Sequence, residues 1–149
     1  MGRHADRTDL GREWGATDVV AERGEEGIAQ VLELTGGDGT HVVVEAVGLR
    51  PAYDMAVGVV RVGGVISRIG VPQYEEAPVG FASLFGKNVT LTGGPAPVRA
   101  YIEERLPEVL DGRLQPAGSS TAPCPSTTFP PDTGRAMDDR ESIKVLVNP

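Results

Sequence analysis

The sequence has very little cysteine, little histidine and few aromatic residues. Cys124 is the one cysteine and His4 and His41 are the two histidines among 149 residues, and aromatic residues make up 5%. One cysteine excludes an intrachain disulfide and a zinc cluster built from several cysteines. No pair of these three residues lies at ligand spacing, so we predict no metal site in this chain.

Positive charge and long apolar runs are also scarce. The net charge is −7 and the pI is about 4.8, which argues against a nucleic-acid or anionic-membrane surface because such a chain repels phosphates. There is no signal-like segment and no apolar run of membrane-spanning length. The expected setting is therefore the cytoplasm, with a small molecule or another protein as the partner.

The most informative stretch runs from Thr40 to Gly48, with the sequence THVVVEAVG. It is a short apolar run rich in β-branched residues, bounded by Gly36-Gly37 before it and closed by a carboxylate and Gly48. This composition and length predict a strand that is buried on both faces, as in the middle of a parallel sheet.

Helical and strand-like segments alternate on both sides of this run. Glycine and proline set their expected ends, and the alternation with short connections predicts an α/β fold with a parallel sheet. The expected helices are Asp6 to Trp14, Glu25 to Leu34, Pro51 to Gly63 and Val98 to Leu110; the expected strands are Thr40 to Gly48, Val65 to Val71 and Val89 to Thr92, and Thr17 to Val20 is a further short apolar piece.

Three successive predicted strands end in glycine, at Val47-Gly48, Ile69-Gly70 and Thr92-Gly93. In a doubly wound sheet the ligand lies against the carboxyl ends of the strands, where glycine lets a ring or a phosphate approach the backbone. The spacing alone is also compatible with three ordinary turns.

Four segments taken in order resemble the cofactor domain of the zinc-dependent alcohol dehydrogenases, within the medium-chain dehydrogenase/reductase superfamily. They are Glu33 to Gly39, Val44 to Gly48, Gly63 to Pro72 and Glu141 to Val145. The resemblance implies part of a six-stranded dinucleotide-binding sheet that is attached to a separate zinc-holding domain. The implied reaction is hydride transfer between NAD(P) and an alcohol or carbonyl carbon.

The resemblance also implies contacts with the cofactor. Val47 and Gly48 would line the nicotinamide side of the crevice, and Lys144 resembles a residue that meets the pyrophosphate. The residues that would flank the ring or offer backbone groups to its carboxamide are Ile69, Gly70, Val71, Thr90 and Thr92. Each of these residues also has a structural alternative. The valines and the isoleucine would be core residues, the threonines ordinary strand residues, and the lysine a solvated charge.

The basic residues Arg3, His4 and Arg7 fall where the family's second strand meets the adenosine ribose. Arginine there favours a 2′-phosphate and hence NADP, whereas an acidic residue would favour NAD. Solvated charges near a chain terminus are the alternative.

Two family features have no counterpart in this sequence. No Gly-x-Gly-x-x-Gly loop precedes Thr8, although this loop seats the pyrophosphate on a helix N-terminus, and the zinc ligands are absent. The fold expected from the resemblance is therefore an incomplete Rossmann-like doubly wound parallel sheet, with its first two strands missing. Thr17 to Val20, at the place of the third strand, would then lack a neighbour, and the Thr40 to Gly48 strand would expose an apolar edge.

The segment from Pro116 to Arg135 is rich in serine, threonine and proline and has no apolar period. It predicts an irregular linker, so the expected divisions are 1–115, 116–135 and 136–149, with a strand at Ile143 to Val147. The family has a segment resembling Pro-Gly-Arg-Val-Phe-Asp-Arg-Thr here, and GC-rich codons for it, read with one base deleted, give the Pro116 to Ala122 sequence. We therefore predict a frame-shifted stretch over 117–135, in which Cys124 has no role.

These features leave several hypotheses for function. The first is the cofactor-binding half of an NAD(P)-dependent zinc alcohol dehydrogenase, not expected to be catalytic by itself. The second is a non-catalytic remnant that binds the dinucleotide weakly, or pairs as a homo-oligomer or with a related subunit through a sheet edge. A third is the product of a decayed gene without a selected role.

Overall fold

The computed structural model describes residues 1–2, 4–116, 122–125 and 145–148. It divides into two compact units. One, which we call the sheet unit, comprises Met1–Arg3 and Asp18–Ala96, and the second unit comprises His4–Thr17 and Pro97–Pro149. The boundaries predicted at 115 and 135 stay predictions.

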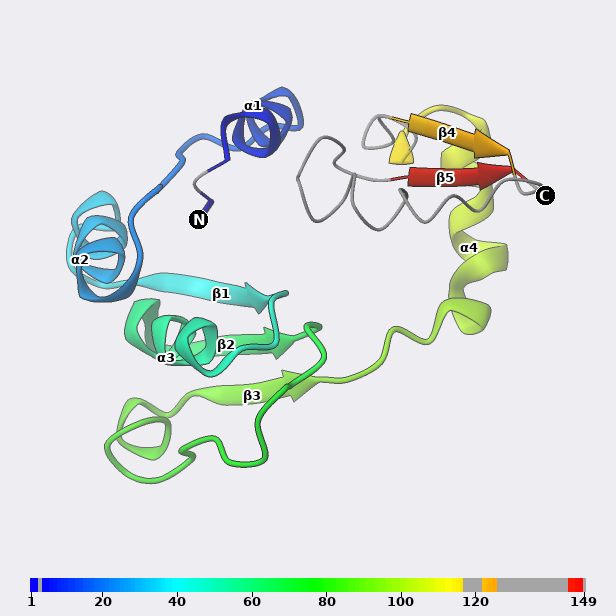
Figure 1. The fold of residues 1–149 in the computed structure, drawn as a ribbon. Coiled ribbons are helices and arrows are strands. Elements are labelled where there is room, and N and C mark those ends of the chain that lie inside the picture. The colour runs from blue at the N-terminus through cyan, green and yellow to red at the C-terminus, as the bar shows by residue number, and fades with distance from the viewer. Residues whose placement is uncertain (3, 117–121, 126–144, 149) are drawn as a thin grey trace. The chain divides into compact units, whose positions relative to one another are not determined.

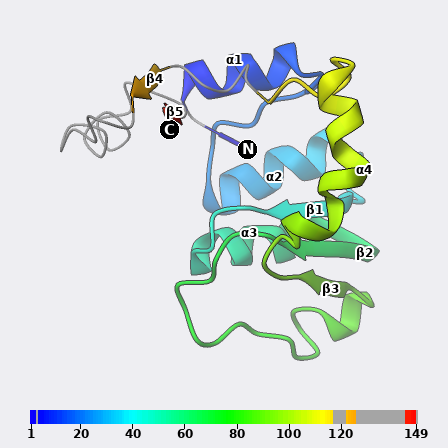
Figure 2. The ribbon, with the colours of Figure 1, turned by 90° about the vertical axis from the view of Figure 1, so that its right-hand side faces the viewer.

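The sheet unit is built on a three-stranded parallel sheet in the order β1-β2-β3 (Figure 1). Helix α3 joins β1 to β2, α2 precedes β1, and a long segment with a short 3₁₀ helix joins β2 to β3 (Figure 2). The predicted α/β class is confirmed. The elements are α2 (Gly24–Leu34), β1 (Thr40–Glu45), α3 (Arg50–Val59), β2 (Val60–Arg68), η1 (Phe85–Lys87) and β3 (Thr90–Gly93).

The strand register gives the sheet one covered face. Val43, Ile66 and Leu91 are partners across the three strands and so share a face, because paired residues on neighbouring strands project to the same side. Ile66 forms the core with Ala56 of α3, and Val43 and Leu91 pack against it. The core is Ala56, Val60, Ile66 and Leu84, with Val43, Val57, Val89 and Leu91 packed against it.

The prediction of a central strand buried on both faces was wrong for β1. Val42 and Val44, which project away from the core residues, are 58% and 59% exposed. Within the described residues β1 pairs with β2 alone, so β2 is the middle strand and β1 is an edge. His41, expected inside a buried strand, is exposed, and its Nε2 lies 2.6 Å from Nη1 of Arg61.

The helix expected from Pro51 to Gly63 is shorter than predicted, because α3 ends at Val59 and β2 begins at Val60. The Lys87 ammonium donates hydrogen bonds to the carbonyl oxygens of Val57 (3.0 Å) and Val60 (3.4 Å). A cation at this end satisfies carbonyl groups that a helix terminus leaves unpaired.

Replacing Lys87 by methionine is expected to lower the free energy of unfolding by about 1 kcal/mol, because two carbonyls at the end of α3 lose their donor. The urea unfolding midpoint measures the change. Lys87→Arg keeps a donor and is expected to unfold close to wild type. An unchanged midpoint in Lys87→Met would contradict this capping role.

The short apolar piece from Thr17 to Val20, placed by the resemblance as a third strand, is not a strand in the structure. Val20 is nevertheless 5% exposed, and its carbonyl accepts a hydrogen bond from the Gly2 amide (2.9 Å). A lone extended segment cannot form a ladder without a neighbouring strand, and among the described residues none lies in register with it.

The second unit contains two helices, α1 (Ala5–Glu13) and α4 (Val98–Leu110), both close to their predicted bounds. Its strands β4 (Ala122–Pro125) and β5 (Val145–Asn148) pair in parallel. The predicted C-terminal strand is thus confirmed from Val145 to Val147, whereas β4 lies in a segment expected to be irregular. The other residues of 117–135 lie outside the described part, and the gene sequence tests the frame shift.

Candidate cofactor site

Seven of the predicted cofactor residues lie in the sheet unit, on or after its three parallel strands. Because parallel strands all end at the same edge of a sheet, the segments that follow β1 and β2 lie side by side. They are Val47 and Gly48 after β1, Ile69, Gly70 and Val71 after β2, and Thr90 and Thr92 in β3.

The chain segments after β1 and β2 touch through glycines. Gly48 has φ +78°, and a Cβ atom on it would collide with the carbonyl oxygen of Val71. A Cβ on Gly70 would collide with the backbone nitrogen of Gly48. The amide of Gln73 donates to the Gly48 carbonyl at 2.8 Å, which holds the two segments together.

The third strand-end glycine behaves in the same way. Gly93 has φ +126°, and a Cβ there would overlap the carbonyl oxygen of Arg68, while the Gly94 amide donates to that oxygen at 2.9 Å. All three strand-end glycines are therefore required by the approach of two backbones. This explains their spacing whether or not a ligand binds beside them.

Glu45 organises the two segments, a role that the sequence interpretation missed. Its side chain is 4% exposed, and its Oε1 accepts hydrogen bonds from the amides of Val47 (2.7 Å) and Gly48 (2.8 Å). Its main-chain carbonyl accepts from the amides of Ile69 and Gly70, both at 2.9 Å. The signal in the sequence was a carboxylate that closes an otherwise apolar strand.

The side chains around the glycine contacts form an exposed apolar group. Val47, Ile69 and Val71 are 53%, 56% and 79% exposed, so the interpretation of them as core residues does not hold. Single exposed apolar residues are common on proteins, whereas apolar residues gathered in one exposed patch mark surfaces that bind a ligand, a membrane or another protein. We call Val47, Ile69 and Val71 the apolar rim.

The two threonines of β3 lie on the face opposite Leu91. Thr90 and Thr92 are exposed and are register partners of Val65 and Ser67 in β2. They continue the uncovered face that Val42 and Val44 begin on β1.

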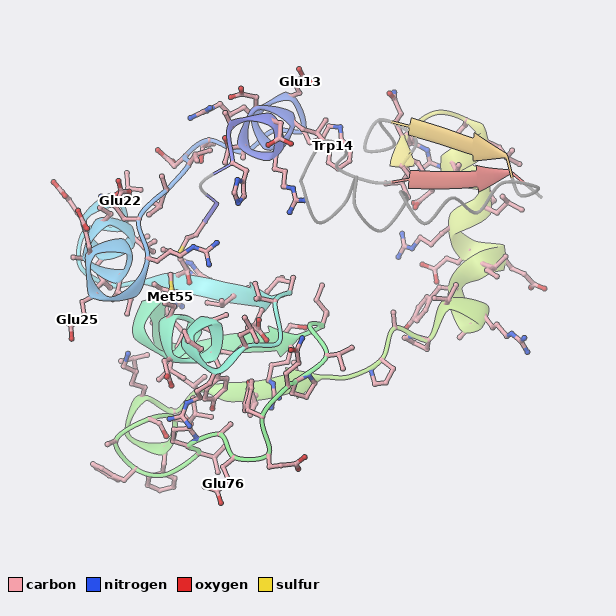
Figure 3. All side chains as sticks on the ribbon, in the orientation of Figure 1. Glu13, Trp14, Glu22, Glu25, Met55 and Glu76 are labelled. Atoms are coloured by element: carbon pink, nitrogen blue, oxygen red, sulfur yellow. The ribbon has the colours of Figure 1, made fainter. Side chains whose placement is uncertain are left out.

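A groove of about 640 Å³ runs along β1 as far as Val47 of the apolar rim. Its walls come from α2, α3 and β1, and the Met55 sulfur, labelled in Figure 3, accepts a hydrogen bond from the Gly24 amide (3.3 Å). Val31, Leu34, Val42 and Val44 are among its apolar lining residues.

The described part of the sheet unit does not include three of the predicted site residues. Arg3 and Lys144 lie outside the described residues. His4 is the N-cap residue of α1 and belongs to the second unit. The predicted contacts with a ribose phosphate and a pyrophosphate therefore stay predictions.

The described residues do not fit a zinc ion. They contain no group of three or more histidine, cysteine, aspartate or glutamate residues that could hold a metal.

In the same part of the chain, no helix has the length and apolar character needed to cross a membrane.

A parallel sheet whose strands are joined through a helix is the architecture of a doubly wound α/β fold. A family model described as zinc-binding dehydrogenase matches residues 1–111. The chain belongs to this zinc-binding dehydrogenase family.

Relatives with alcohol dehydrogenase names are similar to this chain. A probable zinc-binding alcohol dehydrogenase of Mycobacterium tuberculosis is 32% identical over 112 residues, covering 75% of this chain and 28% of that protein. Zinc-type alcohol dehydrogenase B of Aspergillus flavus is 35% identical over 101 residues, covering 67% of this chain and 23% of that protein. The chain thus spans about a quarter of the length of these relatives.

Solved structures show the same fold. Alcohol dehydrogenase TADH from Thermus sp. ATN1 matches with a TM-score of 0.87 and 31% identity, covering 99% of this chain and 43% of that one. The alcohol dehydrogenase of the archaeon Aeropyrum pernix matches with a TM-score of 0.82 and 19% identity, covering 99% of this chain and 41% of that one. The Rossmann-like interpretation of the sheet is thereby confirmed.

Proposed function

We propose that this chain supplies the nicotinamide-facing half of an NAD(P) site in a zinc-type alcohol dehydrogenase. The observation that carries the proposal is the exposed apolar rim beside the glycine contacts at the carboxyl edge of the sheet. An apolar surface beside closely packed backbone suits the flat face of the nicotinamide ring. A bound reduced dinucleotide, NAD(P)H, would donate a hydride to a carbonyl carbon, and a bound oxidised one, NAD(P)+, would accept a hydride from an alcohol carbon.

Each part of the edge has a task in this proposal. Val47, Ile69 and Val71 contact the ring, and Gly48 and Gly70 allow the two segments that carry them to lie together. Backbone groups at Thr90 and Thr92 meet the carboxamide, and Lys144 meets the pyrophosphate. Glu45 holds the segment after β1 through its Oε1.

Titration of the full chain with NADPH, followed by nicotinamide fluorescence, tests the proposal. Saturable binding is expected, and Val47→Asp is expected to weaken it at least tenfold because a carboxylate replaces an apolar contact. Val62→Asp is the matched control, because Val62 is a 70% exposed valine of β2 outside the proposed site. Absence of saturable binding, or equal affinity of Val47→Asp and wild type, would overturn the proposal.

The proposed cofactor is NADP, with the basic Arg3 and His4 on the ribose phosphate. Wild type is expected to bind NADPH about tenfold more tightly than NADH, the worth of one charge-assisted contact. Arg3→Gln is expected to bring the two affinities closer together. Equal affinities for NADPH and NADH in wild type would contradict this preference.

Complete turnover is proposed to need the rest of such an enzyme, because the described residues hold no zinc ligand set. The alcohol or carbonyl substrate would be chosen there. The chain alone is expected to bind the dinucleotide without reducing it in the presence of an alcohol.

A second candidate function is pairing with another subunit or a second copy through the free edge of β1. It rests on β1 having one partner strand within the described residues and on the exposure of Val42 and Val44. Exposed strands with apolar side chains pair readily with other chains. Light scattering of wild type is expected to show a larger species that Val42→Lys with Val44→Lys abolishes, and a monomeric wild type would contradict it.

A further inference from the structure

The side chain of Arg68, at the end of β2, lies against two tyrosine rings that also contact each other. Its guanidinium carbon is 5.6 Å from the ring centroid of Tyr53 in α3 and 5.4 Å from that of Tyr74. The two ring centroids are 6.1 Å apart and the rings are tilted by 46°. Both distances lie within the range of a cation–π contact.

Tyr74 belongs to the segment that leaves β2 and carries Val71 of the apolar rim. The Gln73 amide fixes the first half of this segment on Gly48, and the Tyr53 hydroxyl donates to the Pro78 carbonyl at 2.7 Å at its far end. Between them, Arg50 donates to the carbonyl of Glu76, which Figure 3 labels, at 3.4 Å. We call residues 70–78 the rim segment.

We call Tyr53, Arg68 and Tyr74 the stack. These three residues differ in how firmly the fold holds them. Tyr53 is 0% exposed, burial raises the pKa of its phenol, and its hydroxyl donates to the Pro78 carbonyl. Arg68 stands on β2 itself. Tyr74 is half-buried and comes from a segment without helix or strand, and its hydroxyl has no hydrogen-bond partner among the described residues.

We propose that Tyr74 is a positioning residue for the cofactor, which holds Val71 in place by stacking on Arg68 against Tyr53. The face of the Tyr74 ring makes this contact. The Tyr74 hydroxyl has no hydrogen-bond partner among the described residues. The inference rests on the proposed nicotinamide site, because it assigns the rim segment the task of presenting Val71 to the ring. Tyr74 itself touches no atom of the cofactor in this proposal.

Two ligands separate positioning from general stability. NADPH carries the nicotinamide ring, whereas 2′-phospho-ADP-ribose shares its other groups and lacks the ring. Tyr74→Leu is expected to lose about tenfold in NADPH affinity, the scale of one lost stacking contact, with unchanged affinity for 2′-phospho-ADP-ribose. Tyr74→Phe keeps the ring face and is expected to match wild type with both ligands.

Equal losses for both ligands, or no loss in Tyr74→Leu, would overturn the inference. Wild-type binding of neither ligand would instead overturn the proposed function on which it rests. Hydrogen exchange in the absence of ligand tests the stack by itself: the Gln73 amide is expected to exchange faster in Tyr74→Leu than in wild type and Tyr74→Phe. Equal exchange in the three proteins would contradict the clamping of the rim segment.

Discussion

Replacing Gly48 by alanine is expected to lower the free energy of unfolding of the sheet unit by about 3 kcal/mol and to abolish dinucleotide binding. Two costs combine. The backbone has φ +78°, where a side chain is strained, and the new Cβ would strike the Val71 carbonyl oxygen. The segments after β1 and β2 must then separate, which moves Val47 and Val71 apart. Urea unfolding and NADPH titration measure the two effects.

Gly63→Ala is the matched control for this prediction. Gly63 also lies in the sheet unit and has φ +69°, but a Cβ there meets nothing within 4 Å. It carries the conformational cost alone, expected to be about 1 kcal/mol. Similar losses of stability in Gly48→Ala and Gly63→Ala would show that the contact with Val71 has no energetic importance.

Truncating Glu45 to alanine is expected to cost about 3 kcal/mol, the second largest effect. The amides of Val47 and Gly48 would lose their shared acceptor at a buried position, and unpaired buried donors are costly. Thermal or urea unfolding measures this cost, and weaker NADPH binding is expected alongside it because the segment after β1 is released.

Glu45→Gln separates hydrogen bonding from charge. Glutamine keeps an acceptor oxygen at the place of Oε1, and its amide nitrogen takes the place of Oε2, which has no partner among the described residues. This variant is expected to lose about 1 kcal/mol or less. If Glu45→Gln were as unstable as Glu45→Ala, the two hydrogen bonds would not be the source of the effect.

The elements that local sequence determines were predicted well. Helix α4 has its predicted bounds because Pro97 precedes its first residue and Gly112 follows its last turn. Helix α2 was predicted from the helical spacing of its apolar residues. The length of α3 was not predictable in the same way. Its end is satisfied by Lys87, which donates to the carbonyl of Val57, thirty residues earlier in the chain, a contact that no local pattern contains.

The prediction that β1 is buried on both faces was wrong for a related reason. An apolar run of this length indicates a strand, but it does not say how many neighbours that strand has. Val42 and Val44 are exposed because β1 has one neighbour among the described strands.

The candidate site was predicted by position more than by role. The glycines at 48, 70 and 93 were expected to make room for a ligand, and in the structure they make room for neighbouring backbone. Glu45 and Tyr74 were missed because their roles depend on contacts with segments after the strands. Such contacts are set by tertiary packing, which the residue pattern of one strand does not reveal.

The claim that the carboxyl edge of the sheet receives the nicotinamide ring is tested most directly by two-dimensional amide NMR of the full chain during NADPH titration. The largest shift changes are expected at Ala46 to Gly48 and at Ile69 to Val71, with little change in the outer turns of α3. Changes absent from these two segments, or concentrated elsewhere in the sheet unit, would contradict it.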